Sequence, residues 1–134
     1  MTIQLERYTI TLLVLRADAP KLDDRAAAAL QDGHISHLAD LHEARRVLAG
    51  GPLIDDQLRG LNIMRATPEE ARALVEEDPA VRIGRLSVKT IPWMVPAGAM
   101  HFSRTHFPRA VSEWSDPHPD PPPQAGEGMG GVGL

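Results

Sequence analysis

The chain has 134 residues, a formal net charge of −4 and no cysteine. This length suits one domain of ordinary size and is too short for two independent domains with real cores. The negative charge gives no general attraction to phosphate backbones, which argues against a broad nucleic-acid-binding role. Without cysteine the chain has no disulfide framework, no thiolate nucleophile and no cysteine-ligated metal site.

The N-terminal segment lacks the layout of a targeting or membrane sequence. Acidic and polar residues precede an apolar run of about eight positions, far shorter than the roughly 20 residues of a membrane span. We therefore expect a soluble cytoplasmic protein with no membrane partner.

The first half of the chain predicts a strand, a long helix and a short strand. Residues 8–16 are rich in β-branched and aliphatic side chains that alternate, as in a half-buried strand. Residues 23–44 predict a helix whose first residue, an aspartate, is the N-cap, although Gly33 could divide it. Residues 47–51 predict a second strand, and we expect Pro52 to end its pairing because proline has no N–H group.

The second half repeats this order with stronger boundaries. Residues 60–66 predict a third strand, and Thr67 then begins a helix as a cap followed by proline and two glutamates, which the helix dipole favours there. We expect that helix to stop at Asp78 and Pro79. Residues 85–91 alternate as a last strand, which Pro92 closes.

The order βαββαβ in about ninety residues is the ferredoxin-like plan of α+β proteins, an antiparallel sheet with two helices on one face. The other face of the sheet then needs a cover. Because few aromatic residues are available to make that face tolerant of water, we expect it to pack against the sheet of a second subunit as a homodimer.

The C-terminal part of the chain differs in composition. We place the domain in residues 1–96 and an extension in residues 97–134. In the extension Phe102, Phe107 and Trp114 could dock on the domain, while their spacing fits no regular element. From about residue 116 five prolines and five glycines occupy ten of nineteen positions, which predicts a disordered tail.

Two residues far apart in the chain are the candidate catalytic pair. His37 lies on the apolar face of the first helix, and an imidazole with an ordinary pKa near 6.5 suits proton transfer at neutral pH. A carboxylate beside it, for which Asp78 is the candidate, would orient the ring and stabilise its charged form. The structural alternative is a His37 that fills the helix face with one nitrogen on a backbone carbonyl, while Asp78 only caps a turn.

Three further residues are candidates for substrate binding. Arg59 could receive a substrate carboxylate, and Trp93 could stack on a ligand. His34 is a candidate only through the family resemblance described below, which implies that this position affects how an anionic ligand is held. The plainer alternatives are a solvated arginine and a tryptophan that covers the core. His34, His37 and His42 also raise the question of a metal site, but His42 lies about 140° around the helix from His37, and no carboxylate completes the set. We expect no metal and no cofactor.

A specific family resemblance rests on five motifs in combination. The first four are HLADL around His37, GGPL at residues 50–53, RGL at 59–61 and TPEEARALVEEDPAV at 67–81; the fifth is GRLSVKTIPW at 84–93. Together they resemble the YCII-related (YciI-like) family of dimeric α/β-barrel proteins. The resemblance implies a ferredoxin-like dimer whose active site pairs His37 with Asp78. A relative in chloroaromatic breakdown performs dehydrochlorination, and the fold is shared with muconolactone isomerase-like enzymes.

The sequence departs from the family pattern in three places. Arg45 stands where members usually have a glycine that ends the first helix, so the arginine must adopt a left-handed conformation or change the exit of the helix. His34 replaces an arginine found in part of the family, and Lys89 replaces an acidic residue. These departures bear on the substrate rather than on the assignment of His37 and Asp78.

Three classes of function compete on this sequence. The first is a small cofactor-free enzyme of lyase or isomerase type that acts on a small organic acid by proton transfer between substrate and histidine. The alternative is a non-catalytic module for small-ligand binding or dimerisation. An RNA-binding domain of the same strand order is the third, and it is disfavoured because the central strands carry no aromatic stacking residues.

Overall fold

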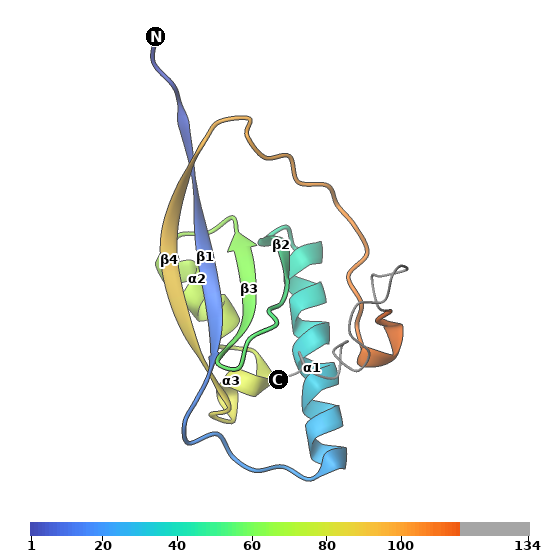
Figure 1. The fold of residues 1–134 in the computed structure, drawn as a ribbon. Coiled ribbons are helices and arrows are strands. Elements are labelled where there is room, and N and C mark those ends of the chain that lie inside the picture. The colour runs from blue at the N-terminus through green and yellow to red at the C-terminus, as the bar shows by residue number, and fades with distance from the viewer. Residues whose placement is uncertain (116–134) are drawn as a thin grey trace.

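The computed structural model describes residues 1–115 (Figure 1). The tail that we expect to be disordered from about residue 116 lies outside the described residues. In chain order the elements are β1 (Leu5–Leu15), α1 (Asp24–Glu43), β2 (Val47–Pro52), β3 (Leu58–Met64), α2 (Pro68–Val75), α3 (Pro79–Arg82), β4 (Leu86–Pro96) and the 3-10 helix η1 (Val111–Glu113). No helix in this part of the chain is both long and apolar enough to cross a membrane.

The four strands form one antiparallel sheet in the order β2-β3-β1-β4. The helices lie on one side of this sheet (Figure 1). The expected α+β, ferredoxin-like fold is therefore confirmed. Strand order also explains the position of the site described below, because α1 packs against the edge strand β2 while α2 packs against β1 and β4.

A small apolar core fills the space between the sheet and the helices. Met64 and Val47 are directly opposite each other in β3 and β2, and both are fully buried. Burial of side chains of this size contributes about 1.5–3 kcal/mol each. The core is completed from β1, β4 and the three helices by Leu13, Leu41, Ala71, Val75, Ala80 and Leu86.

Both predicted helix starts are confirmed. The side chain of Asp23 accepts a hydrogen bond from the N–H of Ala26, and Thr67 forms a reciprocal capping box with Glu70. Helix α1 is not divided at Gly33. A Cβ atom there would lie 3.3 Å from Cγ of Pro79, so the glycine lets the start of α3 approach α1 closely.

Three predicted boundaries were wrong. Strand β2 includes Pro52 and β4 continues through Pro92 to Pro96, because both strands lie at the edges of the sheet, where a missing N–H costs little. Helix α2 ends at Val75, three residues before the predicted stop at Asp78. At Asp78 the chain instead begins the short helix α3, with Asp78 as the N-cap and proline at the first helical position.

Arg45 adopts the left-handed conformation at the end of α1, with φ of 62°. Because a side chain with a Cβ atom is strained there and glycine is not, Arg45→Gly is expected to raise the free energy of unfolding by about 1 kcal/mol. Urea denaturation measures this change. The matched control is Ala44→Gly, whose φ of −77° gives glycine no such advantage and which should be destabilising. Equal destabilisation by the two glycines would contradict the prediction.

Candidate functional site

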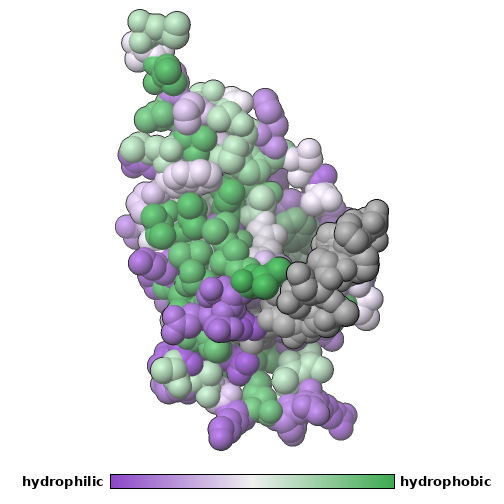
Figure 2. All heavy atoms as spheres, viewed as in Figure 1, coloured by the Kyte–Doolittle hydropathy of each residue, from purple (hydrophilic) through white to green (hydrophobic). Residues whose placement is uncertain are grey.

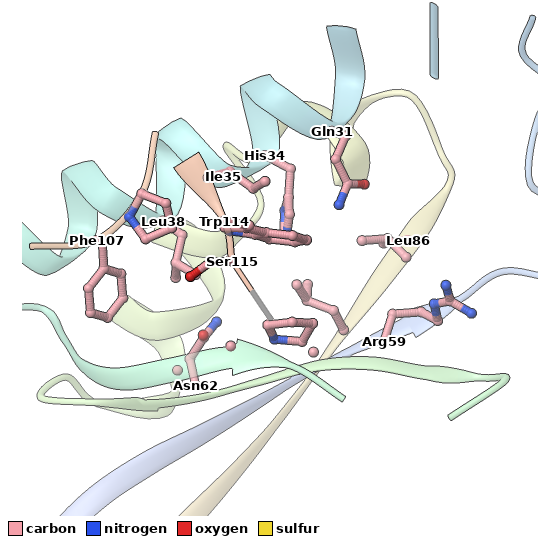
Figure 3. Close-up of a pocket in the computed structure, with 16 residues that line it drawn as sticks. Gln31, His34, Ile35, Leu38, Arg59, Asn62, Leu86, Phe107, Trp114 and Ser115 are labelled. Atoms are coloured by element: carbon pink, nitrogen blue, oxygen red, sulfur yellow. The ribbon is translucent and has the colours of Figure 1, made fainter. Parts of the chain in front are cut away.

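A pocket of about 270 Å³ lies between α1, the sheet and a C-terminal segment, residues 97–115, which we call the strap. Its lining is mostly apolar (Figure 3). Helix α1 contributes His34, Ile35 and Leu38; β1, β3 and β4 contribute Leu13, Asn62 and Leu86; and the strap contributes Phe107, Pro108, Trp114 and Ser115.

Asp78 is a buried carboxylate with two partners. It is 3% exposed, and its Oδ1 atom accepts a hydrogen bond of 2.8 Å from the N–H of Ala80 at the start of α3. Its Oδ2 atom bonds to Nδ1 of His34. The close approach of Pro79 to Gly33 sets α3 against this turn of α1, which places the carboxylate level with His34. One aspartate therefore both caps a helix and orients an imidazole.

His34 is half-buried and presents one ring nitrogen to the pocket. Its side chain is 16% exposed and lines the cavity, and its ring points from α1 toward the space beside Trp114 (Figure 3). With Nδ1–H donating to Asp78, Nε2 has no partner among residues 1–115. Since no buried polar side-chain atom in that range lacks a partner, Nε2 is open to the cavity.

The sequence led us to expect His37 beside Asp78, but the structure does not bring these two residues together. Nε2 of His37 lies 2.9 Å from the carbonyl oxygen of Leu74, so its N–H donates to the end of α2. His37 also does not line the pocket. The reason is helical geometry: three residues along α1 move a side chain by about 4.5 Å, which is enough to exchange a contact with α3 for a contact with α2.

Of the other two predicted binding residues, Arg59 lies at the pocket and Trp93 does not. Arg59 is half-buried and lines the pocket. Trp93 does not line it, because it lies on β4 directly opposite Tyr8, and the alternation of both strands directs these two side chains to the other face of the sheet. Trp93 therefore does not contact this pocket in the single chain.

The turn between β2 and β3 holds Arg59 at the edge of the pocket. Asp55 organises the turn, because its Oδ2 atom accepts hydrogen bonds from the N–H groups of Leu58 and Gln57. These two bonds lower the pKa of Asp55. Nη1 of Arg59 donates to the carbonyl oxygens of Asp55 and Asp56 at 3.3 Å each. These two backbone contacts help to hold the guanidinium at the edge of the pocket.

The strap is fixed to α1 by one buried histidine and one arginine. The N–H of Thr105 donates to Nε2 of His42 at 3.2 Å, so the proton of that ring is on Nδ1, which donates to the carbonyl oxygen of Val47 at 2.8 Å. Phe107 stacks on the same imidazole, with ring centroids 3.8 Å apart. Arg109 forms ion pairs of 2.8 and 3.0 Å with Asp40 and Glu43 of α1.

The strap follows no regular sequence pattern, so the sequence does not predict that its residues line a pocket. From sequence, Phe107 and Trp114 are only residues that could dock on the domain. The sequence likewise predicts His34 as an anion contact and not as the partner of Asp78. Its signal in the sequence was the adjacent Gly33, which marks the point where another element approaches the helix.

The arrangement is suited to proton transfer. A carboxylate that accepts from Nδ1–H fixes the tautomer of an imidazole, leaves Nε2 as a base, and stabilises the charged ring after proton uptake. Apolar walls around the base strengthen such interactions by excluding water. Within residues 1–115 no group of three or more histidine, aspartate or glutamate side chains is arranged to hold a metal ion.

Comparison with known proteins gives one family. Residues 10–94 match the family model of the YCII-related domain. Among curated proteins, none is significantly similar to this chain. The match covers most of the sheet, the helices α1, α2 and α3, and the residues His34, Arg59 and Asp78, and it ends before the strap.

Proposed function

The chain belongs to the YCII-related domain family, and on that premise we propose that it is a small enzyme of lyase or isomerase type that acts on an organic acid. His34 is the proton carrier, Asp78 is its positioning partner, and Arg59 contacts the substrate carboxylate. The observation that carries the proposal is the hydrogen bond that Nδ1–H of His34 donates to Asp78, which leaves Nε2 open to the pocket.

The chemistry needs no co-reactant. In an isomerisation Nε2 takes a proton from a carbon that an adjacent carbonyl makes acidic, and the electron pair of the C–H bond shifts into that system. The imidazolium, stabilised by Asp78, then returns the proton at another carbon. In an elimination the same electron pair expels a leaving group on the neighbouring carbon. Arg59, at the edge of the pocket, would hold the acid group away from the base.

The family resemblance implied the pair His37 and Asp78, and we assign a different part to His37. Its bond to Leu74 joins α1 to α2 and so supports the position of α1 beside the sheet. In this chain a histidine stands at position 34, where part of the family has arginine. We infer that this substitution supplies the ring that meets Asp78.

Proton exchange in D₂O tests the proposal. The protein is incubated with ring-containing keto acids and unsaturated lactone acids, and ¹H NMR follows the replacement of hydrogen by deuterium at carbon. Exchange that depends on His34 is the expected result. Saturable binding of these acids without any exchange would reject the enzyme and favour the alternative, a ligand-binding module.

We also propose that the chain forms a homodimer through the open face of its sheet, the face turned away from the helices. Hydrophobic side chains gather over the strands on this face (Figure 2). Ile10, Leu12 and Val14 of β1 and Ile63 of β3 alternate with the core residues and are only half-buried in the single chain. An apolar sheet face of this kind is typical of an interface rather than of a solvated surface.

Ile10→Glu is expected to break this dimer. The carboxylate would be buried against Ile63 and Ile91, which lie directly opposite on β3 and β4, and this burial of an unpaired charge should weaken association by at least about 100-fold. Sedimentation equilibrium should give twice the chain mass of 14.6 kDa for the wild type and the single-chain mass for the variant. Arg25→Glu, on the exposed start of α1, is the control with a larger charge change and should remain dimeric. A monomeric wild type would contradict the proposal.

A further inference from the structure

Three glycines lie on the sheet side of the pocket, beside the side chains of Leu13, Asn62 and Leu86. Gly50 and Gly51 of β2 and Gly60 of β3 all line it. A Cβ atom on Gly50 would lie 2.1 Å from Oδ1 of Asn62, so no larger residue fits there without a shift of that side chain. The planar amide of Asn62 therefore occupies the space over Gly50, and this amide and the neighbouring glycine backbone form part of the sheet side of the pocket.

An indole ring lies across the pocket from this backbone. Trp114 is half-buried, and its ring stands between α1 and the ribbons of β2 and β3 (Figure 3). The strap that carries it is held by Phe107 on His42 and by Arg109 on α1, and the N–H of Val111 donates to Oδ1 of Asp32 at 3.0 Å. The strap lies beyond the matched residues 10–94, so the family domain does not supply this ring.

The volume of the pocket and the charge of its lining limit the class of ligand that it can bind. The volume of about 270 Å³ is below the roughly 300–1,000 Å³ of sites for drug-sized ligands, which points to a single ring. Of the described residues that line the pocket, none is aspartate or glutamate, and Arg59 is positively charged. These features favour a small anion.

We propose that the pocket is a slot for one flat ring that bears a carboxylate, and that Trp114 is the residue that selects for flatness. This inference rests on the proposed function, because it takes the same pocket as the site. A planar ring can lie against the flat amide of Asn62 and against the indole at once. A puckered ring of the same number of atoms is thicker and loses one of the two contacts. The stacking contact, beyond the burial of area, is worth a few-fold in affinity.

Calorimetric titration of the full chain with benzoate and with cyclohexanecarboxylate tests this selectivity. The two acids have the same carboxylate and six ring carbons and differ in ring shape. We expect benzoate to bind the wild type about 3- to 10-fold more tightly. Trp114→Ala should lower the affinity for benzoate by a similar factor and change that for cyclohexanecarboxylate little. Trp114→Phe, which restores a flat ring, should recover most of the preference.

Equal affinities in the wild type, binding of neither acid, or an equal loss for both acids in Trp114→Ala would overturn the inference. The binding experiment needs no turnover, so it tests the slot independently of the proton-exchange experiment. Exchange without ring selectivity rejects the slot and leaves the proton-transfer proposal standing. Selective binding without exchange supports the slot and rejects the proposed chemistry.

Discussion

Replacement of His34 by alanine is expected to slow proton exchange in D₂O by about 10²- to 10⁴-fold, the usual contribution of a positioned general base. The pocket keeps Arg59 and its apolar walls, so binding of the acid should fall much less than the rate. Exchange rates from ¹H NMR, measured at saturating substrate, separate the two effects. Circular dichroism verifies that the variant is folded, because the carboxylate of Asp78 loses a partner.

The matched control for His34→Ala is His37→Ala, one turn further along the same helix. His37 donates to the carbonyl oxygen of Leu74 and does not line the pocket. Its replacement should cost about 1 kcal/mol of stability and leave exchange within a few-fold of the wild type. The opposite result, exchange lost in His37→Ala and retained in His34→Ala, would return the assignment to the one that the family resemblance implies.

Asp78→Asn tests whether the carboxylate sets the tautomer of the His34 ring or only fills the space beside it. The amide oxygen can still accept from the N–H of Ala80, so the cap of α3 is kept. The amide nitrogen then faces Nδ1 of His34 and must donate to it, which moves the ring proton to Nε2 and removes the base. Exchange is therefore expected to fall nearly as far as in His34→Ala, with a smaller loss of stability than Asp78→Ala shows.

Asp78→Ala is expected to lower the free energy of unfolding by about 2–4 kcal/mol, the largest stability effect that we predict for a polar residue. The variant loses the N-cap of α3, worth about 1 kcal/mol. It also leaves the ring N–H of His34 without its buried acceptor, which costs a further 1–3 kcal/mol. Urea denaturation followed by circular dichroism measures the change.

Glu77→Ala is the control for this effect. Glu77 is the neighbouring acid and is exposed, so its loss should change stability by no more than about 0.5 kcal/mol. A change in Asp78→Ala no larger than that in Glu77→Ala would show that the buried carboxylate contributes nothing and would contradict the description of the site.

Local chemistry was sufficient to predict most of the fold. Thr67 and Asp23 cap helices as their side chains and neighbours indicated, because capping is decided within four residues. The two strand ends that we predicted at prolines were wrong because they are not decided by local sequence. Whether Pro52 or Pro92 ends a strand depends on which strands lie at the sheet edges, and that is a property of the whole topology.

The site was predicted only in part, for a related reason. The sequence predicted that Asp78 meets the face of α1 that carries His34 and His37, and the structure shows that contact. It could not choose between the two histidines, which lie on that face one turn apart. The choice depends on the close approach of Pro79 to Gly33, a contact between elements 46 positions apart in the chain. The strap was out of reach because its anchors, His42 stacked on Phe107 and Arg109 paired with α1, follow no local periodicity.

The tautomers of the histidine rings test the central claim most directly. Long-range ¹H–¹⁵N NMR of the wild type at about pH 9, well above the ordinary imidazole pKa of about 6.5, reads which nitrogen carries the proton. The hydrogen bonds predict Nδ1–H for His34, which donates to Asp78, and Nε2–H for His37, which donates to Leu74. If the spectra instead place the proton of His34 on Nε2, the pairing with Asp78 and the base that faces the pocket are both wrong.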